Sequence, residues 1–382
     1  MNIVFLVVCR FPYGDASSVR AVNICRLLKQ TGHNIHVIGD YPSEENEKLD
    51  FCTYEIVLNN NNSFFKRQSA GKKSVAKLRE YCKNSKVDAV LMNARYDRFN
   101  IVSDFCKKHN IKLLVENCEW YHNSSFKLGK FDLRFWRNQH MIKNDFKKAD
   151  GFISISSFLD NHNKNFAMSV RIPTILDVKE CEFSLSTNNK KLQIVYTGSP
   201  GKSKEFLKPV CEVLSNDPML REKITFNIYG PSYKNVLINV GNEHILKECG
   251  NSVIVHGRVP QNEIQKILME ADYLLFLRPK RRSSDAGFPT KLGESFAVGT
   301  PVITNNTGDI GLYLKDGENG YLLKNMDYDS IRDVLYRALD YKKNSPNMRK
   351  NARITAENYF DFRIYENQIN QLLSGVFNND KA

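Results

Sequence analysis

The chain has 382 residues, of which 42% are hydrophobic and 25% charged, and its formal net charge is +13. This length is too great for one ordinary core and predicts two domains of roughly 180 residues each. Nine cysteines are scattered without a Cys-x-x-Cys pair, which argues against a zinc site or a disulfide framework and indicates the reducing cytoplasm.

The first half predicts strands that alternate with helices. Its opening apolar run, Asn2–Val8, is typical of a buried parallel strand; the run is too short to span a membrane and lacks the basic flank of a signal peptide. A helix with apolar positions from Val19 to Leu28 follows and ends at Gly32. Further strands are predicted at Asn34–Ile38, Val87–Met92, Ile111–Val115 and Gly151–Ile155. This alternation predicts a doubly wound parallel sheet.

The second half restarts the pattern after a segment at 170–190 that we interpret as a linker. Strands are predicted at Lys191–Thr197, Ile224–Tyr229, Val253–His256, Tyr273–Leu277 and Val302–Thr304, and a last helix at Ile364–Phe377. The predicted boundaries are an N-terminal domain at 1–180, a C-terminal domain at 181–360 and a final helical segment at 361–382 that packs back on the N-terminal domain. Two such α/β domains facing a central cleft offer a common place for a small-molecule site.

Residues 286–301 are the most informative segment. They follow the buried strand Tyr273–Leu277 and a basic loop that begins at Arg278, and they open a short helix at about Thr290 that stops at Gly299. Free backbone amides and the helix dipole make such an N-terminus an anion site, at the strand end where open sheets bind ligands. Glu294, one turn into the helix, is placed to hold a sugar diol, so we predict a nucleoside diphosphate site. The alternative is an ordinary strand–loop–helix unit with an exposed carboxylate.

Four motifs together resemble family 4 glycosyltransferases, over nearly the whole chain. They are Thr31-Gly-His33 after the first helix, Val195-Tyr-Thr-Gly-Ser199 with Lys204, Val255-His-Gly-Arg-Val-Pro260, and Gly287–Pro301 with Lys315–Tyr321. The Phe-Pro-Thr-Lys-Leu-Gly-Glu form within the last motif resembles bacterial enzymes that build surface polysaccharides. The resemblance implies the GT-B fold, in which two Rossmann-like doubly wound domains face a central cleft.

The resemblance also implies a donor site for a nucleoside-diphosphate sugar, with UDP favoured over GDP. Lys204 and Arg278 would neutralise the diphosphate, amides around Lys291 would add hydrogen bonds, and Glu294 would hold the ribose. The other residues assigned to donor binding are Gly14, Gly198, Arg258, Asp285, Pro289, Thr290 and Leu292. Gly14 would let the backbone of the N-terminal domain approach the phosphate, because glycine has no Cβ.

The chain departs from the family pattern at three positions. Ala286 stands where the family has a glutamate that grips the donor sugar, so Asp285 is a candidate substitute. Ser199 stands where the family has a phosphate-binding arginine. Glu116 stands where many relatives have a histidine. Glu116, Glu119 and His122 are therefore candidates for acceptor activation; the alternative is that these side chains have no catalytic role.

The function implied is that of a retaining transferase that moves a hexosyl or N-acetylhexosaminyl group to a hydroxyl of a glycan or lipid-linked acceptor. No metal and no cofactor is predicted, because a cationic site at a helix terminus can stabilise the leaving diphosphate. Asp327-Tyr-Asp329 mimics a metal-binding motif, but helix capping explains it better. The alternatives are a non-catalytic nucleotide-sugar sensor and a nucleotide-sugar epimerase.

The densest cationic stretch covers residues 66–86, where eight Lys and Arg residues face the single acid Glu80 beside Phe64 and Phe65. Two interpretations stand: a solvated helix face, or a surface that holds the protein peripherally at the inner face of an anionic membrane. A nucleic-acid partner ranks lower, because no stacking or recognition-helix pattern accompanies the charge.

Overall fold

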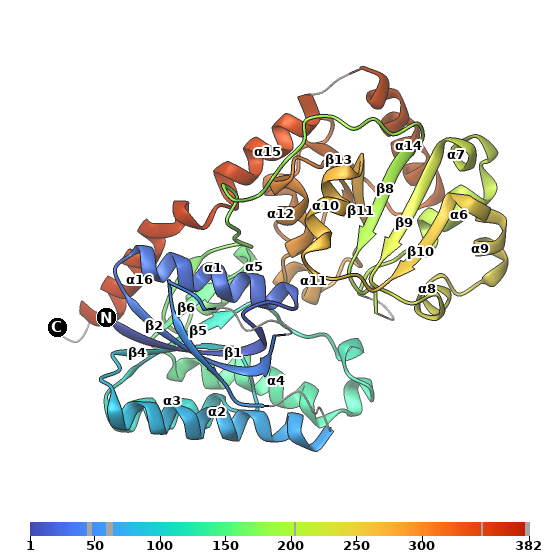
Figure 1. Cartoon of the computed structure of the whole chain (residues 1–382). Helices are drawn as coiled ribbons and strands as arrows, with labels where there is room; N and C mark the ends of the chain where they lie inside the picture. Colours follow the sequence, from blue (N-terminus) through green and yellow to red (C-terminus); the bar gives the residue numbers. More distant parts are fainter. Residues whose placement is uncertain (44–47, 59–63, 202–203, 345–346, 379–382) are drawn as a thin grey trace. The chain divides into compact units, whose positions relative to one another are not determined.

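The computed structural model describes residues 1–43, 48–58, 64–201, 204–344 and 347–378, with side chains for all of these except 64–69 and 341–344. The chain divides into two compact units, each a layered α/β domain (Figure 1). Unit 1 comprises Met1–Leu176, Asp285–Phe288 and Phe362–Ala382, and unit 2 comprises Asp177–Ser284 and Pro289–Asp361. The sequence did not predict that Asp285–Phe288, in the middle of the C-terminal half, groups with unit 1. The central cleft that the sequence analysis expects between the two domains stays a prediction.

Unit 1 is built on a seven-stranded parallel sheet in the order β3-β2-β1-β4-β5-β6-β7. Its strands are β1 (Asn2–Phe11), β2 (Asn34–Pro42), β3 (Thr53–Ile56), β4 (Ala89–Asn93), β5 (Lys112–Asn117), β6 (Gly151–Ser154) and β7 (Met168–Arg171). The central strand β1 is buried almost throughout, which is why it reads as a continuous apolar run rather than an alternating one.

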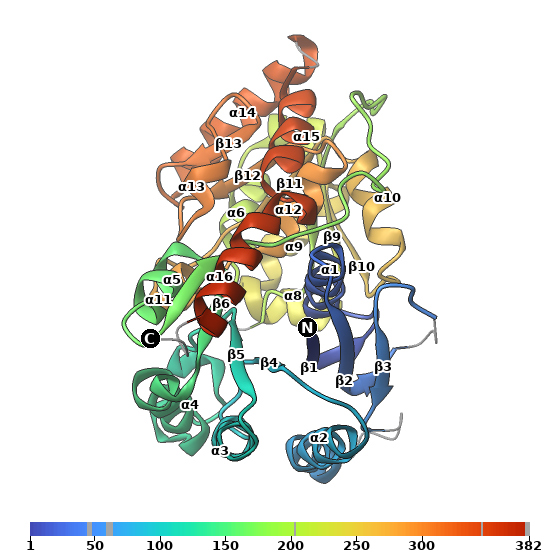
Figure 2. The ribbon, with the colours of Figure 1, turned by 90° about the vertical axis from the view of Figure 1, so that its left-hand side faces the viewer.

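Helices cover both faces of this sheet. Figures 1 and 2 show α1 (Ala16–Gln30) and α16 (Glu366–Asn378) on one face, and α2 (Phe64–Asn84), α3 (Phe99–His109) and α4 (Leu133–Asn144) on the other. The remaining helical segments of unit 1 are η1 (Asn123–Ser125), η2 (Gly129–Phe131), η3 (Asp145–Lys148), α5 (Ser157–Asn163) and η5 (Phe362–Tyr365). Helix α1 begins after Asp15, whose carboxylate accepts from the Ser18 amide while the Ser18 hydroxyl accepts from the Asp15 amide. This reciprocal pair satisfies two amides that the helix itself leaves open.

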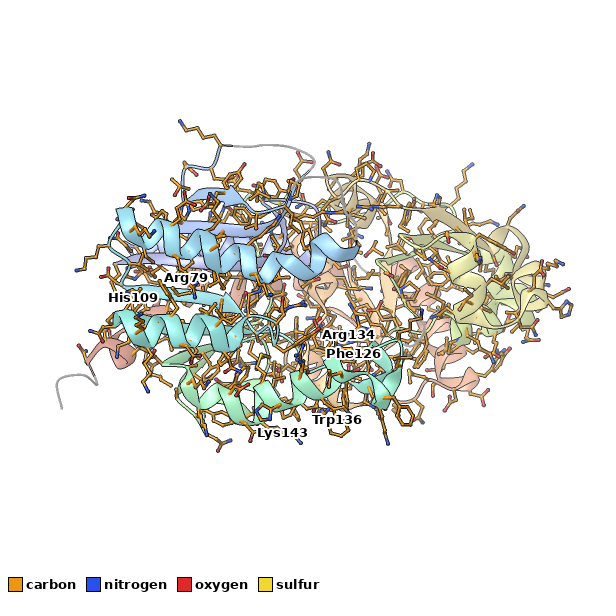
Figure 3. All side chains as sticks on the ribbon, turned by 90° about the horizontal axis from the view of Figure 1, so that it is seen from below. Arg79, His109, Phe126, Arg134, Trp136 and Lys143 are labelled. Atoms are coloured by element: carbon orange, nitrogen blue, oxygen red, sulfur yellow. The ribbon has the colours of Figure 1, made fainter. Side chains whose placement is uncertain are left out.

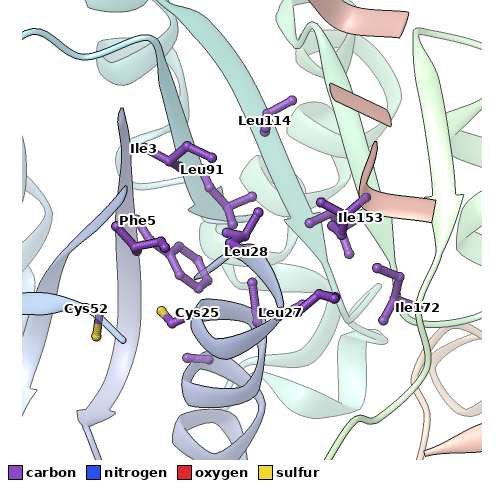
Figure 4. Close-up of a cluster of buried hydrophobic side chains, with 14 of the residues drawn as sticks. Ile3, Phe5, Cys25, Leu27, Leu28, Cys52, Leu91, Leu114, Ile153 and Ile172 are labelled. Carbon is purple, nitrogen blue, oxygen red and sulfur yellow. The ribbon is translucent and has the colours of Figure 1, made fainter. Parts of the chain in front are cut away.

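The core of unit 1 lies between α1, α16 and the sheet (Figure 4). Leu27 and Leu28 of α1 and Phe5 of β1 are at most 1% exposed. Helix α16 adds Ile369 and Leu372 to the same cluster. Burying one such side chain contributes roughly 1.5–3 kcal/mol. The last helix of the chain is therefore part of the N-terminal core.

A buried ion pair ties three elements of unit 1 together. The Arg98 guanidinium, just before α3, donates to both carboxylate oxygens of Asp40 on β2 at 2.7 and 2.8 Å, and Ser74 of α2 donates to Asp40 at 2.8 Å. Both charged side chains are 1% exposed. Arg98→Met should lower the free energy of unfolding by about 3–5 kcal/mol, because it leaves an unpaired buried carboxylate. Urea denaturation measures the change, and the exposed Arg79→Met is the control; a loss below about 1 kcal/mol would contradict this prediction.

Unit 2 is built on a six-stranded parallel sheet in the order β10-β9-β8-β11-β12-β13. Its strands are β8 (Leu192–Thr197), β9 (Ile224–Tyr229), β10 (Val253–Gly257), β11 (Tyr273–Phe276), β12 (Val302–Asn305) and β13 (Gly320–Leu323). The helical segments that follow β8 are α6 (Lys208–Asn216), α7 (Pro218–Lys223), α8 (Tyr233–Val240), α9 (Glu243–Cys249), η4 (Gly250–Ser252), α10 (Glu263–Glu270), α11 (Arg282–Ala286), α12 (Thr290–Ala297), α13 (Ile310–Tyr313), α14 (Tyr328–Asn344) and α15 (Asn347–Tyr359).

The predicted doubly wound α/β class is confirmed for both units. The sequence missed β3, β7 and β13, and all three are four-residue strands at an edge of their sheet. An edge strand pairs on one side only, so it needs no long apolar run and leaves a weak signal. Within the described ranges, no helix is long and apolar enough to cross a bilayer.

Candidate functional site

The strand order of unit 2 reverses between β8 and β11, which is the place where open α/β sheets bind ligands. From β8 the sheet grows through β9 and β10 on one side, and from β11 through β12 and β13 on the other. The loop after β8 reaches the end of β11, because the Phe206 amide donates to the Leu277 carbonyl at 2.9 Å. Candidate residues that follow β8 and β11 are thereby brought to one edge.

Two glycines at this edge of the sheet have backbone conformations and spacings that exclude a side chain. Gly198, after β8, has φ +120, and Gly230, after β9, has φ +113. A Cβ on Gly230 would lie 2.2 Å from the Gly198 carbonyl oxygen, so neither the conformation nor the spacing tolerates a side chain there. The predicted residue Gly198 therefore presents bare backbone at the switch point.

A buried charged network lies beside Gly198. Lys291, in the first turn of α12, places its Nζ 2.7 Å from an oxygen of Glu205. The Tyr196 hydroxyl donates to the same carboxylate, and the Lys291 Nζ lies 4.3 Å from the centre of the Tyr196 ring. A Cβ at Gly198 would come within 3.2 Å of the Lys291 Nζ. The network thus holds a cation against the glycine backbone at the end of β8.

Burial and charge compete within this network. Burial lowers the pKa of the Lys291 ammonium, and the Glu205 carboxylate acts in the opposite direction. Burial by itself raises the pKa of Glu205, but Lys291 and the Tyr196 hydroxyl outweigh it, and the net direction is down. The net pKa of Lys291 is also lowered, because burial outweighs the charge of Glu205. No local pattern indicated a role for Glu205, because its partner Lys291 lies 86 residues away.

Helix α12 confirms the predicted strand–loop–helix unit. Pro289 precedes its first turn and makes no side-chain cap bond. The Leu292 amide donates to the Pro289 carbonyl at 3.1 Å, so the amides of Thr290 and Lys291 are the candidates to bind an anion. Leu292 is fully buried and anchors the helix. Glu294 is half-buried; its burial raises the pKa of the carboxyl, and the charge of Lys291 partly offsets that effect.

The other predicted cations of unit 2 differ in exposure. Lys204 is exposed, and its amide donates to the Pro200 carbonyl at 3.0 Å. Arg278 is 7% exposed, and the Asn305 side chain bonds to both its backbone amide and its carbonyl at 2.8 Å. Arg258 is exposed beyond the end of β10. The structure therefore fixes the backbone of Arg278 and leaves Lys204 and Arg258 at the surface of unit 2.

Glu116, on β5 of unit 1, is held in a structural network. It is 2% exposed, with Arg20 Nε at 2.8 Å from one oxygen and the Asn93 amide hydrogen-bonded to the other. The same Arg20 guanidinium donates to the carbonyls of Ile172 and Pro173. Both oxygens of Glu116 are therefore engaged by side chains of unit 1.

The two other acceptor-side candidates are more accessible. Glu119 is exposed, and it raises the pKa of the nearby Tyr121 hydroxyl, an effect that burial of that hydroxyl strengthens. His122 is half-buried, and its Nδ1 lies 3.3 Å from the Ser124 amide, which it caps at the start of η1. The catalytic role of these two residues stays a prediction.

The remaining predicted residues are placed as follows. Gly14 of unit 1 has φ +147 and packs on Arg10. A Cβ added to Gly14 would lie 2.9 Å from the Cβ of Arg10. Asp285 groups with unit 1, next to Ala286, whose carbonyl accepts from Ser156 at 2.7 Å. Asp327 accepts from the Ser330 amide at 2.9 Å, as expected for a helix cap. Arg332 pairs with Asp217 rather than with the Asp-x-Asp motif.

Other features of the described residues lie away from these candidates. A hollow of about 620 Å³ between α2 and α3 is lined by none of the predicted site residues. Within the described part of the chain, no group of three or more His, Cys, Asp or Glu side chains could hold a metal ion.

The sequence of unit 2 resembles a known family. Residues 178–355 match the family model described as glycosyl transferases group 1. The amylovoran biosynthesis glycosyltransferase AmsK of Erwinia amylovora is 29% identical over 131 residues, which are 34% of this chain and 31% of that protein. The aligned segment thus spans about a third of each protein.

The fold resembles solved structures over nearly the full length. A sucrose-phosphate synthase from Thermosynechococcus elongatus has a TM-score of 0.76 at 15% identity and covers 99% of both chains. Anabaena HepE, solved in complex with UDP and glucose, has a TM-score of 0.70 at 15% identity and covers 98% of this chain and 99% of that one. The fold of this chain is that of the GT-B glycosyltransferases.

Proposed function

We propose that the protein is a retaining family 4 glycosyltransferase that moves a sugar from a nucleoside-diphosphate sugar, with UDP favoured, to a hydroxyl of a glycan or lipid-linked acceptor. The observation that carries the proposal is the Lys291–Glu205 pair beside Gly198 at the switch point of unit 2. This site lies within the residues that match the group 1 family model. The name of AmsK and the UDP bound to HepE support a polysaccharide-building role and a UDP donor.

In the proposed mechanism, the enzyme stabilises the negative charge that develops on the leaving diphosphate. Lys204, Arg278, Lys291 and the first amides of α12 supply positive charge and hydrogen-bond donors to the diphosphate, and donors held by the fold need not reorganise during the reaction. Glu294 accepts hydrogen bonds from the ribose hydroxyls and orients the donor. Retention of configuration places the acceptor on the face that the diphosphate leaves, so a diphosphate oxygen takes the acceptor proton. Glu119 and His122 are then the candidates that orient the acceptor.

Ligand binding tests the proposal. A bound ligand raises the melting temperature, so a thermal-shift series with UDP, GDP, ADP and their sugar conjugates should show its largest shift with a UDP compound. Transfer from the selected donor to a lipid-linked acceptor separates a transferase from a nucleotide-sugar sensor, and release of a free epimer would indicate an epimerase. If no nucleotide shifts the melting temperature, the proposed donor site is wrong.

Turnover should not depend on a divalent metal, because the protein's own cations and helix amides neutralise the leaving group. EDTA should leave the initial rate unchanged within error. The measurement is sugar transfer before and after chelation, with Mg²⁺ or Mn²⁺ added back. Loss of activity on chelation and its return with either metal would overturn the metal-free mechanism.

Lys204 and Arg278 should act on the same diphosphate. The loop that carries Lys204 is tied to the end of β11, immediately before Arg278, by the bond from the Phe206 amide to Leu277. Each change to alanine should depress kcat/KM strongly, and the double variant should lose less than the sum of the two single losses. Circular dichroism checks that the Arg278 variant is folded. Full additivity would mean that the two cations serve different groups.

We also propose peripheral association with the inner face of the cell membrane, as the cationic stretch at 66–86 suggests. Lys72, Lys73 and Lys83 of α2 are exposed. Lys77, in contrast, pairs with Glu55 and Glu80. The side chains of Lys66 and Arg67 lie outside the described residues. The described part of α2 thus offers cations but no exposed large apolar side chain.

A further inference from the structure

Four large apolar side chains are exposed within nine residues of unit 1. Leu128 is 63% exposed, Phe131 92%, Leu133 67% and Trp136 56%. Leu128 immediately precedes η2, Phe131 ends it, and Leu133 and Trp136 lie on the first turn of α4. We call residues 127–137 the apolar tip. Single exposed apolar side chains are ordinary on protein surfaces, but a contiguous group marks an interaction site.

Local hydrogen bonds hold the segment that presents these side chains. The Asp132 carboxylate accepts from the Arg134 amide at 3.0 Å, which caps α4, and also binds the Arg134 guanidinium at 2.6 Å. These bonds from Arg134 lower the pKa of Asp132 to about 2, so the cap persists at neutral pH. The Trp136 indole donates to the Lys130 carbonyl at 2.8 Å, which joins the helix to the preceding turn. The apolar tip therefore keeps its exposed side chains outward without a partner to hold them.

One side of α4 packs against the rest of unit 1, and the opposite side carries the exposed side chains. Phe135 is buried, and its ring lies 6.0 Å from Phe126 and 5.1 Å from Trp136, both edge to face. Met141 and Ile142 are buried, and each is at most 1% exposed. Figure 3 looks onto this face of unit 1, where Arg134, Trp136 and Lys143 lie along α4, apart from Arg79 and His109.

The charge around the apolar tip selects its partner. Residues 127–148 carry seven cations and two acids; the cations are Lys127, Lys130, Arg134, Arg137, Lys143, Lys147 and Lys148, and the acids are Asp132 and Asp145. Asp132 is buried and engaged with Arg134, and Asp145 is half-buried. Arg134 pairs with Asp132 and Lys148 with Asp104, and the exposed surface thus combines apolar side chains with an excess of positive charge. A second copy of the chain would bring like charges together, whereas an anionic bilayer interface accepts both features.

We propose that the apolar tip is a membrane anchor, in which Leu128, Phe131, Leu133 and Trp136 enter the headgroup region of an anionic bilayer while Lys127, Lys130 and Arg137 contact lipid phosphates. The anchor is separate from α2, whose described part has exposed cations but no exposed large apolar side chain. The anchor deepens the peripheral membrane association proposed above, on which it rests, by naming a surface that binds the lipid. It would bring the enzyme to a lipid-linked acceptor.

Vesicle co-sedimentation tests the anchor. The wild-type protein should bind vesicles that contain phosphatidylglycerol and should not bind phosphatidylcholine alone, and salt should weaken the binding because it screens the charges. A triple variant, Leu128→Ser, Phe131→Ser and Leu133→Ser, should bind anionic vesicles at least roughly tenfold more weakly. The control variant, Met219→Ser with Ile354→Ser, replaces exposed apolar side chains of unit 2 and should bind like the wild type.

Tryptophan fluorescence provides a second readout. The chain has two tryptophans, and Trp120 is 6% exposed whereas Trp136 is 56% exposed. Anionic vesicles should therefore shift the emission to shorter wavelength, and Trp136→Phe should remove that shift. A change of Lys72, Lys73 and Lys83 to Glu should leave the shift in place.

Three outcomes would overturn the anchor: no binding to anionic vesicles at low salt, wild-type binding by the triple variant, or loss of binding in the α2 variant alone. The thermal shift with UDP should be the same in the triple variant and in the wild type. A failure of the anchor is thereby distinguished from a failure of the donor site.

Discussion

Lys291→Met is expected to abolish sugar transfer and to lower the free energy of unfolding by about 3–5 kcal/mol. The Lys291 Nζ lies 2.7 Å from Glu205, and the two side chains are 13% and 4% exposed. Removing the ammonium leaves a buried carboxylate with the Tyr196 hydroxyl as a neutral partner, which costs stability. It also removes the cation beside Gly198, which in our account faces the leaving diphosphate. Urea denaturation and initial rates measure the two losses separately.

The double variant Lys291→Met with Glu205→Gln separates the structural from the catalytic loss. Neutralising Glu205 removes the uncompensated charge, so most of the stability should return, whereas transfer should stay abolished. Glu205→Gln alone should retain measurable transfer, because Lys291 remains charged in its place. If the double variant recovers transfer together with stability, Lys291 serves the fold and not the diphosphate.

Glu294→Ala is expected to weaken UDP binding by about 1.5–3 kcal/mol, which is roughly 10- to 150-fold in Kd. The carboxylate lies one turn into α12, half-buried, where a hydrogen bond from a ribose hydroxyl to a charged acceptor is strong. Glu294→Gln should lose less, because the amide oxygen still accepts one hydrogen bond.

Titration calorimetry with UDP measures the effect of the Glu294 change. The matched control is Glu243→Ala, which removes an exposed carboxylate from the first turn of α9 in the same unit. An unchanged affinity in a folded Glu294→Ala variant would remove this residue from the donor site.

The sequence predicted those parts of the fold and the site that depend on local signals. Central strands such as β1 and β11 are buried on both faces, so their continuous apolar runs were readable. The segment from Phe288 to Glu294 was readable because a strand, a turn and a helix start follow one another within a few residues. Edge strands such as β3 were missed, because one open side allows polar residues.

Long-range pairings were not readable. Glu205 and Lys291 are separated by 86 residues, and nothing in the local pattern of either one indicates its partner. Glu116 was a candidate for acceptor activation because it stands where many relatives have a histidine, but the side chain of Arg20, 96 residues away, binds its carboxylate. The apolar tip was not predicted, because the exposure of Phe131 and Leu133 becomes visible only when the structure shows which side of α4 is packed.

Hydrogen–deuterium exchange of the wild-type protein with and without UDP tests the central claim most directly, because it locates the bound nucleotide on the chain. Our account predicts slower exchange in peptides that cover the loop after β8 and the start of α12, where Gly198, Lys291 and Glu294 lie. Peptides from α2 and α3, which line the hollow of unit 1, should exchange at the same rate with and without UDP. Protection confined to those two helices, or no protection anywhere at a saturating concentration of UDP, would contradict a donor site at the switch point of unit 2.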